Sequence, residues 1–324
     1  MNDGSSEVFL TGASGFIGGR LLRALASRGV PTRCLVRSAE HFPTRGFCGT
    51  QPRVIRGDLL QPETFRGAME GTHTAYYLVH SMGGRSAFRY KDYIRKDLDA
   101  ARNFARAAEE SGVRRIVYLG GLGEVADNLS EHLRSRQEVA RLLQSSRVPV
   151  TVLRAANIIG AGGAPFEMLR HLVERLPVMI CPRWIDTRCQ PIAVENVIEY
   201  LEGCLDEPKT AGRTFDIGGA EILTYRQLMQ TYARVRHLRR WIFTVPVLTP
   251  HLSSYWITLV SSVPAGVVMP LVEGLKNEVV CRDHAIRELI PIRLLSMEEA
   301  VRNALGELAR GPGGLPSCQS CLRN

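Results

Sequence analysis

Thr11-Gly12-Ala13-Ser14-Gly15-Phe16-Ile17-Gly18 is a turn with three glycines that joins two apolar segments of different periodicity. Residues 8–11, which lead into it, form a short apolar run that predicts a buried strand. Residues 16–28 carry their large apolar side chains on one helical stripe and are followed by Gly29, which predicts an amphipathic helix. The turn therefore lies between a strand and a helix, where the diphosphate of a dinucleotide binds.

Each glycine of this turn has its own role in such a site. Gly12 permits the tight turn, Gly15 lets the backbone approach a diphosphate, and Gly18 lets the helix pack closely on the strand. The alternative is a turn without a ligand, but the position at the start of a strand–helix series favours the dinucleotide site. The other residues expected to contact the cofactor here are Ser14, Phe16 and Ile17.

Strands and helices alternate along the first two thirds of the chain. The further predicted strands are 33–36, 54–55, 74–79, 115–119, 150–153 and 214–217. Helical patterns lie between them, the longest over 86–111, and one helix is expected to begin at Pro62. This rhythm predicts an α/β fold with a doubly wound parallel sheet.

We expect two domains and a tail. The dinucleotide-binding domain covers 1–217, of which 156–183 contributes to a small substrate lobe; the lobe covers 218–310 and a flexible tail covers 311–324. Residues 241–275 in the lobe are apolar but interrupted by four prolines, which favours a pocket wall over a membrane-spanning helix. Contact of this region with an anionic membrane surface is the less favoured alternative.

Composition and charge are typical of a globular protein and argue against several other kinds of site. The chain has 324 residues, 45% hydrophobic and 23% charged, as is typical of globular proteins. Its net charge of +9 comes mainly from scattered arginines, which argues against a nucleic-acid groove. Eight irregularly spaced cysteines predict no disulfide framework, and Cys318 and Cys321 in the tail lack a second pair of zinc ligands, so no metal is expected. Residues 1–7 are polar and lack a signal-peptide core, so we expect a cytoplasmic protein.

The ends of the second and third predicted strands bear on the choice of cofactor. Arg37 stands where an NAD site would place a carboxylate, and Arg33 lies earlier in the same strand. A cation there favours the 2′-phosphate, so NADP(H) is expected and NAD(H) is the second choice, unless Arg37 is only a surface charge. Asp58 is placed either to accept a hydrogen bond from the adenine amino group or to cap the next turn.

Several stretches together resemble one family. They are the glycine turn, Gly57-Asp58, Tyr77-Leu78-Val79-His80-Ser81-Met82 and Tyr118-Leu119-Gly120-Gly121-Leu122-Gly123. They resemble the atypical short-chain dehydrogenase/reductases, with the YbjT-like and NmrA-like NAD(P)-binding proteins as the nearest group and the extended epimerases and dehydratases as relatives. The resemblance implies a Rossmann domain with a small substrate lobe. It also implies cofactor contacts at Leu59, Leu78, Val79 and Gly120. Asn157 follows the predicted strand 150–153 at the same edge of the sheet, where its amide can contact the nicotinamide or the substrate.

The chain departs from this family at the catalytic positions. Active members carry Tyr-x-x-x-Lys on the helix after the fifth strand, whereas His132 and Arg136 stand there in this chain. His132 can donate a proton near neutral pH, and Arg136 can anchor the nicotinamide ribose or a substrate anion; otherwise both are ordinary surface residues. His80, beyond the fourth strand, is another candidate for proton transfer, or a residue that only hydrogen-bonds the backbone.

These features favour an oxidoreductase that uses NADP(H) to reduce an apolar, lipid-like carbonyl or quinone-like compound. The missing Tyr–Lys pair beside an intact glycine turn leaves a second hypothesis, a non-catalytic NADP(H)-sensing or assembly protein of the NmrA-like type. A nucleotide-sugar epimerase or dehydratase is the third hypothesis and is disfavoured, because that chemistry relies on the absent pair. The expected partner is a small-molecule substrate, and no binding of nucleic acid is expected.

Overall fold

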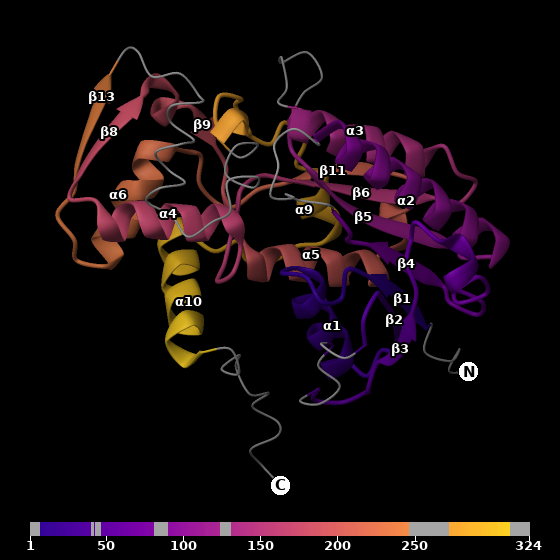
Figure 1. The fold of residues 1–324 in the computed structure, drawn as a ribbon. Helices are drawn as coiled ribbons and strands as arrows, with labels where there is room; N and C mark the ends of the chain where they lie inside the picture. Colours follow the sequence, from indigo (N-terminus) through magenta and orange to yellow (C-terminus); the bar gives the residue numbers. More distant parts are fainter. Residues whose placement is uncertain are drawn as a thin grey trace, which may run out of the picture.

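A computed structural model of the chain describes residues 7–39, 42, 47–80, 90–123, 131–245 and 272–311. A seven-stranded parallel sheet lies between two layers of helices, and a smaller lobe of helices and short strands lies beside it (Figure 1). This arrangement confirms the expected α/β fold with a doubly wound sheet. The predicted segments that fall on 81–89, 246–271 and 312–324, among them the cysteines of the tail, lie outside the described residues.

The sheet runs in the order β11-β6-β5-β4-β1-β2-β3, and all its neighbouring strands are parallel. Its strands are β1 (Val8–Thr11), β2 (Thr32–Val36), β3 (Arg53–Arg56), β4 (Thr74–Tyr77), β5 (Arg115–Gly121), β6 (Val150–Ala155) and β11 (Thr214–Ile217). The strand order reverses between β1 and β4, and a ligand of such a sheet binds outside the carboxyl ends of the strands at this point. The glycine turn follows β1 and His80 follows β4, so both lie at this reversal.

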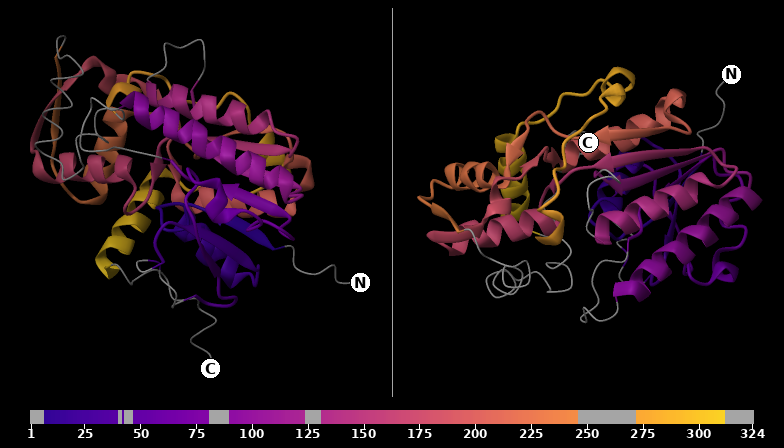
Figure 2. Two further views of the ribbon diagram at one scale, coloured as in Figure 1. Left: turned by 45° about the vertical axis from the view of Figure 1, so that its right-hand side comes forward. Right: turned by 90° about the horizontal axis from the view of Figure 1, so that it is seen from above.

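Helices cover both faces of the sheet. On one face lie α1 (Gly18–Ser27) and α5 (Val194–Asp206), and on the other lie α2 (Tyr90–Glu110) and α3 (Glu131–Gln144) (Figure 2). Val8 and Leu10 of β1 pack with the first pair, whereas Phe9 packs with the second pair. Because successive side chains of a strand point to opposite faces, a strand buried on both faces is apolar throughout, as residues 8–10 are.

A third apolar cluster forms the core of the lobe. It draws on α4 (Ala164–Arg175), α6 (Tyr225–Val235), α10 (Met297–Arg310) and β8 (Val178–Pro182), which pairs in parallel with β13 (Trp241–Val245). The remaining short elements are η1 (Pro62–Phe65), β7 (Ile158–Ile159), η3 (Arg183–Asp186), β9 (Arg188–Cys189), β10 (Ile192–Ala193), η4 (Pro208–Thr210), β12 (Leu223–Thr224) and α9 (Ala285–Leu289). No helix among the described residues is long and apolar enough to cross a membrane.

One local expectation needs correction. Pro62 does begin a helical segment, but η1 is a single 3₁₀ turn that ends at Phe65. Arg66 is extended and Gly67 has a φ of +70°, so the backbone turns away after four residues. The apolar content of this segment is too small to hold a longer helix on the sheet, since Phe65 is its one buried residue.

Asp216 in the edge strand β11 joins this strand to β6 and to the chain segment at Arg282. Its carboxylate is buried, accepts a hydrogen bond from Arg154 Nε at 2.7 Å and another from the backbone N–H of Arg282 at 3.0 Å. Asp216→Ala leaves both donors and a largely buried guanidinium without this partner, so we expect a loss of about 3 kcal/mol in unfolding free energy, measured by urea denaturation. Glu110→Ala, which removes an exposed ion pair with Arg106, is the control and should change stability little. Similar small losses for both variants would contradict this role of Asp216.

Candidate functional site

The glycine turn brings α1 unusually close to β1. Gly12 has a φ of +74°, and a Cβ atom there would lie 2.6 Å from the carbonyl oxygen of Leu78. A Cβ atom on Gly18 would lie 2.1 Å from the carbonyl oxygen of Gly12. Neither distance is possible in a folded protein, so both positions require glycine. Gly15 is less constrained, because a Cβ atom there would lie 3.1 Å from the Gly12 oxygen.

The amino end of α1 has the properties of an anion site. The backbone N–H groups of Phe16, Ile17 and Gly18 donate to no acceptor in the part of the chain that the structure describes. The first turn of α1 carries no acidic residue and no side-chain cap. Unsatisfied N–H groups and the positive end of the helix dipole together favour a phosphate. The residues present therefore fit the diphosphate of a dinucleotide.

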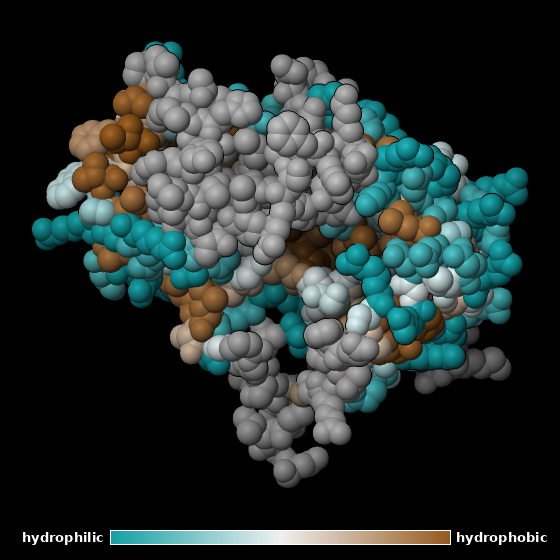
Figure 3. All heavy atoms as spheres, in the orientation of Figure 1, coloured by the Kyte–Doolittle hydropathy of each residue, from teal (hydrophilic) through white to brown (hydrophobic). Residues whose placement is uncertain are grey.

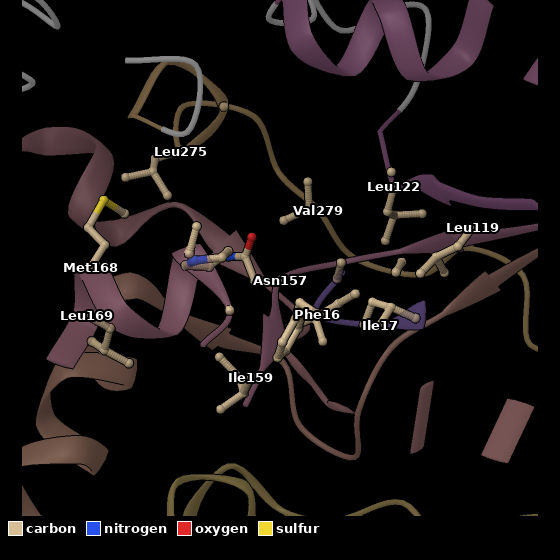
Figure 4. A pocket seen from close by; sticks show the side chains of 18 of the residues that line it. Phe16, Ile17, Leu119, Leu122, Asn157, Ile159, Met168, Leu169, Leu275 and Val279 are labelled. Atoms are coloured by element: carbon tan, nitrogen blue, oxygen red, sulfur yellow. The ribbon is translucent and has the colours of Figure 1, made fainter. Parts of the chain in front are cut away.

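A cavity of about 500 Å³ lies between this turn and the lobe. It is walled by the carboxyl ends of β4, β5 and β6 on the side of the sheet and by α4 and α6 on the side of the lobe. In Figure 4, Phe16, Ile17 and Leu119 lie on one side of Asn157, and Met168, Leu169 and Leu275 lie on the other. The predicted site residues that line this cavity are Gly15, Phe16, Ile17, Gly18, Leu78, His80, Gly120, Arg136 and Asn157.

His80 is paired with a buried carboxylate. Its Nδ1 lies 3.0 Å from Oδ2 of Asp97 on α2, and the two side chains are 18% and 7% exposed. An ionised carboxylate only accepts hydrogen bonds, so this contact assigns a proton to Nδ1 and leaves proton exchange to Nε2. Burial lowers the pKa of His80, the Arg136 charge lowers this pKa further, and Asp97 partly opposes both effects. The imidazole is therefore mainly neutral at pH 7.

Arg136 is held at the end of β5 rather than projecting into solvent. Its guanidinium donates to the carbonyl oxygen of Leu119 at 2.5 Å and lies over the ring of Tyr118, 5.4 Å from the centroid. The Tyr118 hydroxyl in turn donates to the backbone oxygen of Arg136 at 3.2 Å. These contacts keep a permanent positive charge beside the cavity. His132 belongs to α3, one turn earlier, but its side chain lies outside the described residues.

Asn157 brings polar atoms into a mostly apolar wall. Its Nδ2 donates to the Tyr225 hydroxyl at 3.1 Å, and the Tyr225 ring meets Trp184 edge to face at 6.4 Å between centroids. Asn157, Tyr225 and Trp184 all line the cavity. Sequence reasoning identified Asn157 but missed Tyr225, because a tyrosine at the start of a helix carries no signal of a site.

Arg20 also went unnoticed in the sequence. Its guanidinium donates to the backbone oxygens of Phe16 at 2.9 Å and Ala161 at 2.8 Å, and pairs with Glu307 of α10 at 2.5 Å. It also stacks on the Phe16 ring, 4.5 Å from the centroid. One side chain thus fastens the glycine turn to the loop before α4 and to the lobe.

The two arginines of the second strand have different surroundings. Arg37 is exposed and has no hydrogen bond or ion pair among the described residues. Arg33 pairs with Glu7 and donates to the backbone oxygen of Glu70 at 2.8 Å. Arg33 lies about 13 Å back along the strand from Arg37, toward the amino ends of the strands, and these partners engage its guanidinium there.

The other predicted cofactor residues stay predictions. Asp58 Oδ1 accepts from the backbone N–H of Leu60 at 3.0 Å, which is the turn cap considered as the alternative to an adenine contact. Leu59 is buried in the apolar cluster under α2, and Val79 is partly buried against the same cluster. Gly12 and Ser14 belong to the turn without lining the cavity.

The close packing of α1 leads to a test with a matched control. Gly18→Ala forces a methyl group against the Gly12 carbonyl and displaces the anion site, so NADPH and NADP⁺ should bind at least about tenfold more weakly. Gly19→Ala, where the added atom would meet Ala13 O at 3.3 Å, should bind nearly as the wild type does. Isothermal titration calorimetry measures the affinities, and circular dichroism checks the fold. Equal affinities for the two variants would count against this site.

Comparisons with known proteins agree with this geometry. Residues 12–168 match the model of the NAD(P)H-binding family. The chain is 29% identical to ceramide reductase of Caulobacter vibrioides (strain NA1000 / CB15N) over 55% of this chain and 54% of that protein, so it spans about half the length of that relative. It is 23% identical to 4-hydroxy-2-methyl-3-oxo-4-farnesyl-3,4-dihydroquinoline-1-oxide ketoreductase of Stigmatella aurantiaca over 87% of this chain and 90% of that protein. The chain is also 23% identical to photosystem II assembly factor Ycf39 of Trieres chinensis, over 66% of this chain and 64% of that protein.

Solved structures share the fold across nearly the whole chain. A nucleoside-diphosphate-sugar epimerase from Staphylococcus aureus superposes with a TM-score of 0.73 at 18% identity, covering 91% of this chain and 99% of that chain. The structure of MoeE5 in complex with UDP-glucose and NAD superposes with a TM-score of 0.68 at 17% identity, covering 94% of this chain and 99% of that chain. At such identities the likeness concerns the fold alone. With the glycine turn, the family match shows that residues 12–168 belong to the NAD(P)H-binding family, and relatives of the chain lie in the atypical short-chain dehydrogenase/reductase group.

Proposed function

We propose that this chain is an NADP(H)-dependent oxidoreductase that reduces a carbonyl or quinone-like group on an apolar compound. The observation that carries the proposal is the His80–Asp97 pair, which lines the same cavity as the glycine turn. A proton-exchanging side chain and a dinucleotide site then face one space, as a reductase requires. The bound nicotinamide would supply the hydride, and the protein would supply binding, orientation and a proton.

The residues of this chain divide that work. The amino end of α1 binds the diphosphate, and Arg136 places its charge near the nicotinamide ribose or the substrate oxygen. Met168, Leu169 and Leu275 line the end of the cavity toward the lobe and suit an apolar substrate that excludes water. Protonated His80 donates from Nε2 to the substrate oxygen, while Asp97 keeps the ring oriented and stabilises its cationic form. In the reverse direction neutral His80 accepts the proton.

The names of two relatives are consistent with this substrate class. One relative is a ceramide reductase, and another is a ketoreductase whose named substrate carries a farnesyl group. Both names describe reduction of large, lipid-like compounds.

A second candidate, an NADP(H)-sensing or assembly protein of the NmrA-like type, rests on a separate observation. The guanidinium of Arg136 is bound to the backbone oxygen of Leu119, at the position where active family members carry the catalytic lysine. Ycf39, one of the relatives, is named as an assembly factor. A nucleotide-sugar epimerase or dehydratase is supported only by the fold shared with solved structures.

Arg37 supports the preference for NADP(H), because it is an exposed cation just beyond β2, where a 2′-phosphate lies in such folds. Arg37→Asp should weaken NADPH binding about tenfold or more and NADH binding by less than about twofold, because only NADPH carries the phosphate. The control is Arg53→Asp, the same charge change at the exposed start of β3. Fluorescence titration of both cofactors measures the effect. Equal weakening of NADH and NADPH by Arg37→Asp would show that Arg37 does not read the phosphate.

The pH profile of reduction tests the role of His80. Reduction requires the protonated ring, so kcat/KM should fall as the pH rises through the pKa of His80, which lies below the usual value near 6.5. Asp97→Asn removes a group that raises this pKa, so the falling limb should move to lower pH. Arg136→Gln removes a group that lowers it, so the limb should move to higher pH.

The assay is stopped-flow oxidation of NADPH with a panel of quinones and apolar ketones. His80→Gln should lower kcat/KM about a hundredfold without weakening NADPH binding. Limbs that move in the opposite directions, or stay fixed in both variants, would remove His80 from the mechanism. Tight NADPH binding with no turnover across the panel would instead favour the sensing or assembly role.

A further inference from the structure

β8 and β13 present apolar side chains to solvent on one face of the lobe. Trp241 pairs with Val178 and Phe243 with Ile180, so the four lie side by side on the same face of the two-stranded sheet. Their exposed fractions run from 44% to 60%, among the highest of the large apolar residues described. Met179, between Val178 and Ile180, is buried in the core of the lobe. We name the four exposed residues the β8–β13 face.

In the space-filling view, hydrophobic atoms gather over β8 and β13, at the upper left, with hydrophilic residues directly beside them (Figure 3). Such a contiguous apolar patch with a polar rim is typical of an interaction surface. The position of the patch also has a structural meaning. α4 and α6 of the same lobe line the apolar end of the cavity, so the face and the cavity are two sides of one small unit.

The segments that contain and flank this face are strongly basic. The segments 167–188 and 226–243, which contain both strands and the helices next to them, hold nine arginines and three carboxylates. Each of the three carboxylates is already paired with an arginine: Glu167 with Arg170, Glu174 with Arg236 and Asp186 with Arg226. Arg183 and Arg239 are exposed and pair with no carboxylate in the described part of the chain. Arg188 and Arg234 pair with Glu278 and Glu298 outside these segments, so the charges of Arg183 and Arg239 are the ones available to an external anion.

We infer that the β8–β13 face docks on the surface of an anionic lipid bilayer. An apolar surface that includes a tryptophan and a phenylalanine enters the boundary between headgroups and acyl chains, while surrounding arginines bind lipid phosphates. Charge decides between a bilayer and a second copy of this chain. A two-fold contact through the same face would bring two basic rims together, whereas an anionic bilayer neutralises one.

The inference stands independently of the proposed reaction, because it concerns a different surface. Docking would nevertheless favour a lipid-like substrate, because the lobe that lines the apolar end of the cavity would then lie close to the bilayer. No residue of the β8–β13 face belongs to the cavity lining.

Co-sedimentation of the full chain with vesicles tests the docking. The two vesicle types are phosphatidylcholine alone and an equal mixture of phosphatidylcholine and phosphatidylglycerol. Wild-type protein should bind the mixed vesicles and be released by salt, because the arginine contribution is screened. The double variant Trp241→Ser with Phe243→Ser should bind about tenfold more weakly, and so should Arg183→Glu with Arg239→Glu. Leu308→Ser is the control: this exposed leucine lies on α10, away from β8 and β13 (Figure 1), and its loss should have no effect.

Two measurements separate the possible failures. Circular dichroism and NADPH titration establish that each variant is folded, and absence of NADPH binding in the wild type would count against the proposed function without affecting the vesicle result. Wild-type protein that ignores the mixed vesicles, or a Trp241/Phe243 variant that binds them as well as the control, would overturn the inference. A wild-type dimer that this variant converts to a monomer, without vesicle binding, would assign the face to a second copy instead.

Discussion

The contact between the start of α1 and the end of β1 is the constraint on which the rest of this structure depends. The Gly18 Cα atom lies so near the Gly12 carbonyl that no side chain fits between them. This approach turns the first N–H groups of α1 toward the carboxyl edge of the sheet, where the strand order reverses. Arg20, in the first turn of the helix, then fastens the same segment to α10 in the lobe. A close backbone contact thereby sets both the anion site and the position of the lobe.

The cavity lacks the usual Tyr–Lys pair but has a positive charge, Arg136, and a group that can exchange a proton, His80. In the proposed reductase, Arg136 replaces the lysine charge, but it is bound to the end of β5 and acts on His80 through space. His80 is pulled in two directions: burial and Arg136 favour the neutral ring, and Asp97 favours the cation. The net effect is a lowered pKa, so the ring is mainly neutral at pH 7 and Asp97 stabilises the cation that forms when the ring takes up a proton.

The sequence predicted the sheet well, because buried parallel strands are apolar throughout and glycines mark the turns between them. The bounds of β11 match the expected residues 214–217. The β8–β13 pair was not predicted, for two reasons. The β8–β13 pair joins strands about 60 residues apart, and its exposed valine, isoleucine and aromatics break the rule that apolar residues mark the core.

The candidate site was predicted in its backbone parts and missed in its side-chain pairs. Gly12, Gly15 and Gly18 are recognisable because their spacing reflects a local geometry. The Asp97 contact with His80 depends on which face of α2 meets the end of β4, and the Tyr225 contact with Asn157 depends on how the lobe folds back. Arg33 and Arg37 are four residues apart, and β2 places them toward opposite ends of the strands, where Arg33 pairs with Glu7. Such contacts are set by tertiary packing, which periodicity does not encode.

The central claim is that a dinucleotide lies across the amino end of α1 with its nicotinamide in the cavity beside His80. A crystal structure of the protein with NADP⁺ tests it most directly. We expect density for the diphosphate against the backbone N–H groups of Phe16, Ile17 and Gly18, and for the nicotinamide next to His80 and Arg136. Density for the dinucleotide elsewhere on the chain, or none from crystals grown at saturating NADP⁺ with an ordered glycine turn, would contradict it.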